Sequence, residues 1–219
     1  MPVNVNLNVA APVRIARYAP SQDWRLEPFP PAFFPSKPRH VSTSDALVLD
    51  SQAIALIIRR MSAEILERTR GTRKLGLVGV RTGGVPIATR IAAEILNREQ
   101  RTIPVGAIDI GLYRDDAASA LPAKLGPSEI DYAIDGWDVV LVDDVLHTGR
   151  TTRAGIDALL DYGRPRRIWL AVLCDRGGRE LPIAPDFAGT SVQVPPGFVL
   201  DVVADGGDGD RAVLRRKDP

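Results

Sequence analysis

Short apolar runs alternate with helical patterns over residues 50–174, and this alternation constrains the fold more than any other feature. The predicted strands are residues 75–80, 103–110, 139–142 and 168–174, and the predicted helices are residues 51–70, 85–97 and 151–162. Strands that alternate with helices form parallel sheets covered by helices on both faces. The sequence therefore predicts an α/β fold, with further short strands at residues 198–203 and 212–214.

The first 40 residues have a different composition from the rest of the chain. They contain eight of the eighteen prolines, five of them between Pro28 and Pro38. Such a stretch favours extended, weakly ordered backbone. We predict a proline-rich extension over residues 1–40 and one domain over residues 41–219.

Charge and cysteine content exclude several classes of protein. Lys and Arg number 28 against 27 Asp and Glu, so no global field attracts a polyanion. The single cysteine excludes an internal disulfide, and two histidines without a cysteine pair exclude the usual zinc spacings. The longest apolar run, residues 168–174, is too short to span a bilayer, and the first residues lack an export signal. We expect a cytoplasmic protein with no membrane partner.

Residues 139–152 carry the most chemistry. An apolar strand ends in Asp143 and Asp144, and a short loop then leads into a helix. Helix starts offer unpaired amide groups and a positive dipole end, which suit a phosphate monoester. The candidate phosphate-binding residues are Leu146, His147, Thr148, Gly149, Arg150, Thr151 and Thr152.

The two acids fit the sugar of the same ligand. Carboxylates accept hydrogen bonds from a cis-diol, as an acidic residue does for ribose in dinucleotide folds. Asp143 and Asp144 followed by a phosphate cradle therefore predict a ribose 5-phosphate site. The alternative is that both acids only cap a strand-to-helix turn.

Four segments carry a family resemblance: residues 113–116, 142–151, 161–165 and 175–182. The second resembles the phosphoribosyl diphosphate signature of type I phosphoribosyltransferases. Together the segments resemble one subgroup, the bifunctional pyrimidine operon regulators and uracil phosphoribosyltransferases, over roughly residues 48–203. The resemblance implies a central, mostly parallel sheet flanked by helices, a flexible loop, and a small hood at about residues 175–200.

The resemblance also implies a reaction. Ribose 5-phosphate would pass from phosphoribosyl diphosphate to N1 of uracil, giving UMP and diphosphate, with Mg²⁺ carried on the diphosphate oxygens and no metal ligand from the chain. Positive charge develops on the sugar as the bond breaks, so Asp144 would favour the transition state as well as bind ribose. A transferase for another base is the alternative.

Three further groups of residues receive roles from the resemblance. Arg81, Thr82 and Gly83 would bind diphosphate in a turn that often contains a strained peptide bond, unless that turn binds no ligand. Arg114, in the flexible loop, would neutralise charge in the transition state or simply pair with its acidic neighbours.

Cys174, Asp175 and Arg176 would lie under the hood and read uracil through backbone groups. Cys174 itself is typical of a small buried hydrophobe rather than a nucleophile. His147 could contact phosphate when protonated, or be an ordinary loop histidine.

The regulator function would add a partner, pyrimidine operon leader mRNA, bound in response to UMP. Arg60 and Arg179 match that pattern, but Ala63, Gly178 and Ala184 replace its polar residues. A regulator that has lost this type of RNA binding is therefore an alternative. Related proteins form dimers and tetramers, so a homodimer or homotetramer is expected.

Residues 205–210 are acidic and rich in glycine, like a calcium loop. Gly207 stands where the third-position ligand would be, and no glutamate closes the site. The sequence favours a simple turn.

Overall fold

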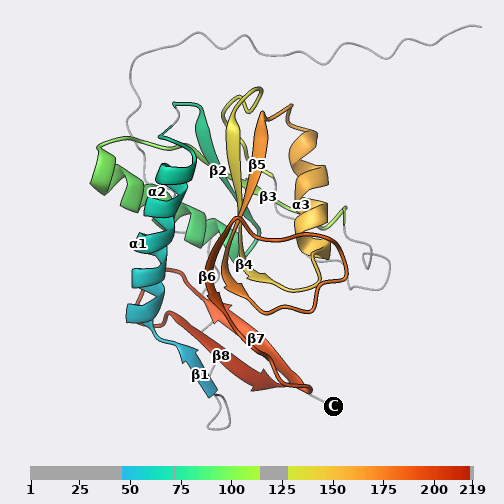
Figure 1. Cartoon of the computed structure of the whole chain (residues 1–219). Helices are drawn as coiled ribbons and strands as arrows, with labels where there is room; N and C mark the ends of the chain where they lie inside the picture. The colour runs from blue at the N-terminus through green and yellow to red at the C-terminus, as the bar shows by residue number, and fades with distance from the viewer. Residues whose placement is uncertain (1–45, 72, 114–127, 218–219) are drawn as a thin grey trace, which may run out of the picture. The chain divides into compact units, whose positions relative to one another are not determined.

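A computed structural model describes residues 46–71, 73–113 and 128–217, which form two sheets and three helices (Figure 1). The predicted extension at residues 1–40 and Arg114 lie outside the described residues. The elements in chain order are β1 (Ala46–Leu49), α1 (Ser51–Arg68), β2 (Leu75–Val80), α2 (Gly84–Glu99), β3 (Val105–Ile108), β4 (Asp138–Leu146), α3 (Arg150–Leu160), β5 (Arg167–Asp175), β6 (Phe187–Ser191), β7 (Phe198–Val203) and β8 (Arg211–Arg216).

The larger sheet is five-stranded and parallel throughout, in the order β3-β2-β4-β5-β6. Figure 1 shows α1 and α2 on one side of this sheet and α3 on the other. The predicted α/β architecture is confirmed. Because all five strands run the same way, their carboxyl ends meet at one edge, where ligands bind in open sheets of this kind.

Two apolar clusters fill the space between the sheet and its helices. On one face, α1 contributes Ile54, Ile58, Met61 and Ile65, whose spacing forms the predicted stripe, and all four are buried. On the other face, Ala154, Ala158 and Leu159 of α3 pack on alternate residues of the same strands. No helix within the described ranges has the length and apolar character needed to cross a membrane.

The smaller sheet is antiparallel, in the order β1-β8-β7. It lies below the larger sheet in Figure 1, next to the carboxyl ends of the parallel strands. Nη1 of Arg90 on α2 pairs with Oδ2 of Asp210 at 2.6 Å. Oδ1 of the same carboxylate accepts hydrogen bonds from the amides of Gly206 and Gly207. The acidic segment before β8 is therefore a turn held by Asp210, as the sequence favours.

The segment predicted as a hood, residues 175–200, is not a unit of its own. Its middle part, β6, is the edge strand of the parallel sheet, where Phe187 pairs with Ala171 of β5. A Cβ on Gly189 would lie 2.3 Å from the carbonyl oxygen of Leu173, so this strand needs glycine for its close approach. The separate small sheet is built instead from β1, β7 and β8.

Candidate active site

The ends of β2 and β4 bring two predicted binding segments together. These strands are neighbours, with Gly79 paired to Val142, so the Arg81 turn and the two acids open at the same edge of the sheet. β4 continues to Leu146, four residues beyond the predicted end, because β5 pairs alongside it as far as Asp175. Both acids are therefore part of β4 itself, near the end of its pairing with β5, rather than in a loop after the strand.

Asp143 and Asp144 form an interacting pair of carboxyl groups. Oδ1 of Asp143 accepts a hydrogen bond from the amide of Asp144 at 3.0 Å, and Oδ1 of Asp144 accepts one from the amide of Val145 at 2.7 Å. Burial raises the pKa of both groups, and the charge of Asp144 raises the pKa of Asp143 further. The side-chain hydrogen bond between them raises the pKa of Asp143 and lowers that of Asp144.

Two glycines allow the start of α2 to approach β4. A Cβ on Gly83 would lie 2.2 Å from Oδ2 of Asp144, and one on Gly84 would lie 2.0 Å from the carbonyl oxygen of Val142. Because real Cβ atoms do not come this close, neither position has room for a side chain unless its neighbour moves. The predicted diphosphate turn therefore lies directly against the predicted ribose acid.

The rest of that turn is built around Arg81 and Thr82, which are joined by a cis peptide bond. The amide of Arg81 donates to the carbonyl of Ile108 at 2.9 Å. Nη2 of Arg81 lies 3.6 Å from Oε2 of Glu129, and 12% of the side chain is exposed. Thr82 is exposed, so its groups face outward from this edge.

The loop between β4 and α3 has the features of an anion cradle. Gly149 precedes α3 with a φ of +92°, which glycine adopts without strain. Within the described residues the amides of His147, Thr148 and Gly149 donate no hydrogen bond, and the buried hydroxyl of Thr152 has no partner. Unpaired donors at a helix start are what a phosphate needs.

The other predicted members of this loop have separate roles. The Leu146 side chain is buried, so only its backbone faces the loop. Oγ1 of Thr148 accepts from the amide of Arg150 at 3.3 Å, and Nε of Arg150 pairs with Glu180. Thr151 is half-buried in the first turn of α3, beside the cradle.

His147 is exposed at the start of the loop. Burial of the ring, and then the charge of Arg176, lower the pKa of its imidazole. The lowered pKa favours the neutral imidazole, so it argues against a contact between protonated His147 and phosphate. A Cβ on Gly178 would lie 2.9 Å from Nε2 of His147, so the two loops touch here.

The predicted base-binding residues lie beside the phosphate loop, but only two of them are accessible. Cys174 is fully buried in the apolar core, and burial raises the pKa of its thiol to about 12. The carboxylate of Asp175 binds Nη2 of Arg179 at 2.7 Å and the amide of Gly177 at 2.9 Å. The amide of Arg176 donates to the carbonyl of Leu146 at 3.0 Å.

The two arginines predicted for RNA binding are engaged within the chain. Arg60 on α1 pairs with Glu64 at 2.6 Å and donates to the carbonyls of Ala188 and Gly189 in β6. Arg179 donates to the carbonyl of His147 at 2.9 Å and to that of Ile183 at 2.9 Å, besides its bond to Asp175. Sequence reasoning missed these roles, because no local pattern marks an arginine whose acceptors are distant carbonyls.

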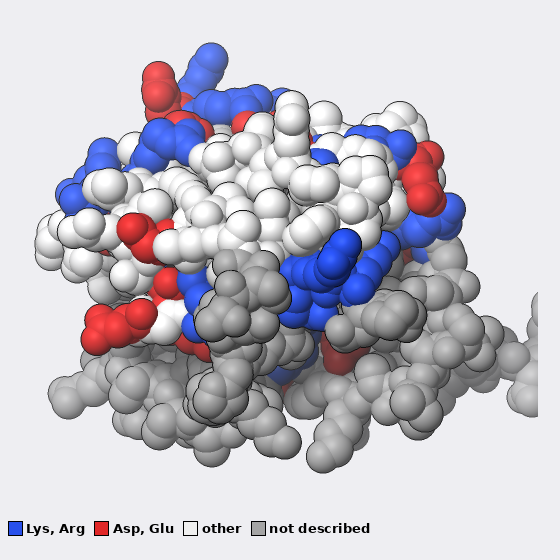
Figure 2. All heavy atoms as spheres, turned by 90° about the horizontal axis from the view of Figure 1, so that it is seen from below, with Lys and Arg blue, Asp and Glu red and all other residues white. Residues whose placement is uncertain are grey.

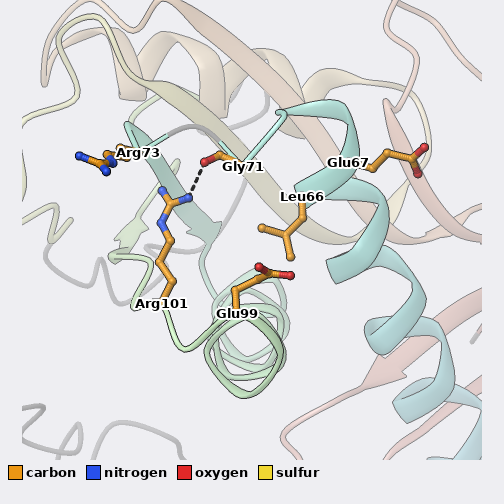
Figure 3. A pocket seen from close by; sticks show the side chains of 6 residues that line it. All are labelled: Leu66, Glu67, Gly71, Arg73, Glu99 and Arg101. Atoms are coloured by element: carbon orange, nitrogen blue, oxygen red, sulfur yellow. Dashed lines mark hydrogen bonds between the residues drawn. The ribbon is translucent and has the colours of Figure 1, made fainter.

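Seen from the side of the small sheet, one group of basic side chains lies near the centre of the face, and other basic and acidic groups lie around its edges (Figure 2). A hollow of about 480 Å³ lies elsewhere, between the ends of α1 and α2 (Figure 3). It is lined by Leu66, Glu67, Gly71, Arg73, Glu99 and Arg101. None of the predicted site residues lines it, so it is separate from the edge of the sheet that carries them.

Comparison with known proteins identifies the class of protein. The model of the phosphoribosyl transferase domain matches residues 46–203. A crystal structure of the hypoxanthine phosphoribosyltransferase of Trypanosoma cruzi superposes with a TM-score of 0.59 at 18% identity, covering 78% of this chain and 97% of the other. A strand ending in acids, followed by an amide cradle, occurs here on the type I phosphoribosyltransferase fold, and the chain is a phosphoribosyltransferase, an enzyme of pentosyl transfer.

Curated relatives narrow the class to a family. The "Bifunctional protein PyrR" of Pelotomaculum thermopropionicum is 46% identical over 170 residues, which covers 77% of this chain and 94% of the relative. The protein of the same name from Roseiflexus sp. is 53% identical over 146 residues, covering 66% of this chain and 80% of the relative. The chain belongs to the PyrR family, the subgroup that its motifs resemble.

Proposed function

We propose that this protein transfers ribose 5-phosphate from phosphoribosyl diphosphate to N1 of uracil, forming UMP and diphosphate. The observation that carries the proposal is the continuity of the Asp143–Asp144 pair with the unpaired amides of His147, Thr148 and Gly149. Acids for the ribose hydroxyls and donors for the 5-phosphate follow one another in a single segment of chain.

The ligand would lie along this segment. Its 5-phosphate accepts hydrogen bonds from the loop amides and from the hydroxyls of Thr148, Thr151 and Thr152, each worth about 1.5 to 3 kcal/mol because the acceptor is charged. The ribose hydroxyls donate to the carboxylate of Asp144. Asp143 completes the pair and holds its neighbour in place.

The chemistry needs no protein nucleophile. The bond from C1 of ribose to diphosphate breaks while N1 of uracil forms a bond to the same carbon, and the N1 proton is released to water. Positive charge builds on the sugar, and the negative charge of Asp144 stabilises it. The leaving diphosphate would be held by the backbone of Arg81, Thr82 and Gly83, and by Arg114.

Mg²⁺ would reach the site on the diphosphate. Among the described residues no group of three or more acidic, histidine or cysteine side chains could hold a metal ion. Magnesium often keeps several waters and uses substrate phosphates with one or two carboxylates, so Asp144 beside the diphosphate turn fits this mode. When bound, the ion neutralises charge on the leaving group.

Uracil would be read near the end of β5. The base offers one N–H donor and two carbonyls to residues 174–176, where the amide of Arg176 already donates to Leu146 and the carbonyl of Asp175 already accepts from Val192. The buried Cys174 would contribute backbone and shape rather than its thiol. Asp175 and Arg176 would form the polar part of the base site.

The test is turnover of a panel of bases with phosphoribosyl diphosphate and Mg²⁺. We expect uracil to yield UMP, while hypoxanthine and orotate yield little product. Turnover of hypoxanthine or orotate in place of uracil would favour a transferase for another base.

We propose a second activity, UMP-responsive binding of pyrimidine leader RNA, because the relatives are named bifunctional. Arg60 and Arg179 have partners inside the chain, so the RNA would have to meet other cations. Arg59 is 60% exposed and lies 3.8 Å from Glu94. Arg164, Arg166 and Arg167 lie together before β5, and Arg166 also pairs with Asp138.

Titration into leader RNA, with and without UMP and at several salt concentrations, tests this activity. Tighter binding with UMP and a steep salt dependence are expected. Binding that ignores both UMP and RNA sequence would indicate that the regulator function has been lost. A homodimer or homotetramer and a cytoplasmic location stay predictions, and light scattering would test the first.

A further inference from the structure

Three consecutive carbonyl groups of the phosphate loop are held by the segment that follows β5. The carbonyl of Leu146 accepts from the amide of Arg176 at 3.0 Å. The next, of His147, accepts from Nη1 of Arg179 at 2.9 Å. The third, of Thr148, accepts from the amides of Glu180 and Leu181, both at 3.0 Å.

These bonds determine where the amides of the loop point. In a planar trans peptide the C=O and N–H bonds point in opposite directions, and the only cis bond in the described chain is Arg81–Thr82. Carbonyls fixed toward the segment after β5 therefore turn the amides of His147, Thr148 and Gly149 away from it. These are the amides that donate no hydrogen bond within the described residues.

Arg179 donates to the middle carbonyl, that of His147, through its side chain. The donors to the other two carbonyls at 3.0 Å are backbone amides. The guanidinium of Arg179 also binds Oδ2 of Asp175 at 2.7 Å and the carbonyl of Ile183 at 2.9 Å. Only 23% of the side chain is exposed. The three bonds fix the plane of the guanidinium, so the position of the His147 carbonyl depends on it.

We propose that Arg179 is a positioning residue, which keeps the His147 carbonyl turned away so that the loop amides face the phosphate of the ribosyl ligand. It acts through the loop and does not touch the ligand. The inference rests on the phosphate site of the proposed function. It gives Arg179 a part in phosphate binding in place of the RNA contact that the sequence suggested.

The loop is also closely covered on this side. A Cβ on Gly149 would lie 3.3 Å from Cβ of Leu181 and 3.4 Å from Cβ of Ile183. The peptide planes therefore have little room to flip while the segment stays in place. Loss of the Arg179 guanidinium removes the hydrogen bond to the His147 carbonyl described above. The peptide groups on either side keep their hydrogen bonds from backbone amides.

Ribose 5-phosphate is the direct probe, with its Kd measured by calorimetry. Arg179→Ala is expected to weaken its binding about 10- to 100-fold, the size of a lost charged hydrogen bond. The KM for phosphoribosyl diphosphate should rise with it. The affinity of Arg179→Lys for ribose 5-phosphate should lie between those of the wild type and Arg179→Ala, because an ammonium cannot reproduce the planar set of three bonds.

Arg68→Ala is the matched control. Nη1 of Arg68 also donates to a loop carbonyl, that of Asp186 at 2.6 Å, but it does not contact the phosphate loop. We expect ribose 5-phosphate to bind this variant as it binds the wild type. Equal losses of ribose 5-phosphate affinity in Arg179→Ala and Arg68→Ala overturn the proposal, and so does unchanged affinity in a folded Arg179→Ala variant.

Amide NMR on the unmodified protein tests the same point if Arg179→Ala does not fold. The ¹⁵N–¹H resonances of Thr148 and Gly149 should shift downfield on addition of ribose 5-phosphate, and unchanged resonances under saturation overturn the proposal. Ribose 5-phosphate binding with these shifts but no turnover of uracil would refute the proposed reaction and leave the role of Arg179 intact.

Discussion

A Cβ on Gly83 would lie 2.2 Å from Oδ2 of Asp144, so the turn proposed to bind diphosphate and the acid proposed to bind ribose occupy adjoining space. The two residues come from different strand ends, β2 and β4, which the sheet places side by side. The position of the acid thus depends on a residue that precedes it by about sixty positions in the chain. Any side chain at position 83 must displace the carboxylate.

Gly83→Ala should therefore reduce activity more than stability. The obstructing atoms are Oδ2 of Asp144 at 2.2 Å and its Cγ at 2.5 Å. They belong to a side chain that can rotate, so we expect a smaller effect on the free energy of unfolding than on activity. Moving Asp144 from the sugar should lower kcat/KM for UMP formation about tenfold or more. Gly207→Ala is the control, since its Cβ would meet only open space apart from an atom at 4.0 Å. Equal kcat/KM in the two variants would contradict the shared geometry.

Asp144→Asn removes the negative charge that the developing cation needs. We expect kcat/KM to fall roughly 100- to 1,000-fold, as for loss of one well-placed electrostatic group. Asp131→Asn is the control, because Asp131 is exposed and belongs to the connection between β3 and β4 rather than to the acid pair. Full activity of Asp144→Asn in steady-state assays would refute the ribose assignment.

Thr148→Val keeps the shape of the side chain and removes its hydroxyl. The loop amides remain, so the expected loss is smaller, about tenfold in affinity for ribose 5-phosphate. Calorimetry measures it directly. Affinity equal to that of the wild type would place the phosphate elsewhere.

The acid pair should make stability depend on pH. Burial, and then the charge of Asp144, raise the pKa of Asp143 above its ordinary value of 3.8. The folded state therefore binds the proton more tightly than the unfolded state, and the contribution to stability is complete below 3.8 and lost as pH rises through the raised value.

Asp143→Asn removes this titration. Urea unfolding between about pH 4 and about pH 8 should show that the free energy of unfolding of the wild type falls, relative to that of the variant, as pH rises. Parallel curves for the two proteins would mean that the pKa of Asp143 is not raised.

Arg90→Ala should destabilise the fold. Asp210, whose side chain is 2% exposed, would keep its two amide partners but lose its cation. We expect a loss of about 2 to 4 kcal/mol in the free energy of unfolding, toward the lower side of values for broken buried pairs. Arg98→Ala, on an exposed position of the same helix, should change it by less than about 0.5 kcal/mol. A similar small change in Arg90→Ala would contradict a buried pair.

The periodic helices and the apolar strands of the parallel sheet could be predicted from the sequence. The stripe from Ile54 to Ile65 and the runs in β2 and β5 have a strong local pattern. β6 could not be predicted, because its sequence of small and polar residues becomes a strand only through pairing with β5. β1 is four residues long and depends on a partner at the other end of the described chain.

In the site, the acids and the phosphate loop were predictable because one continuous segment carries them. The support for that loop was not. Arg179, Glu180 and Leu181 act on carbonyl oxygens about thirty residues earlier, and any residue type can supply a backbone acceptor. The close approach of Gly84 to Val142 likewise exists only once α2 packs across β4.

The pairing of Ala46 with Leu214 bears on how the protein is made. β1 leaves the ribosome early, yet the strand it binds is among the last described residues to be translated. The parallel layer can assemble while synthesis continues, whereas the small sheet must wait for β8. A nascent chain stalled before residue 211 would therefore hold a formed parallel sheet, with its proposed phosphate loop, beside an unpaired first strand.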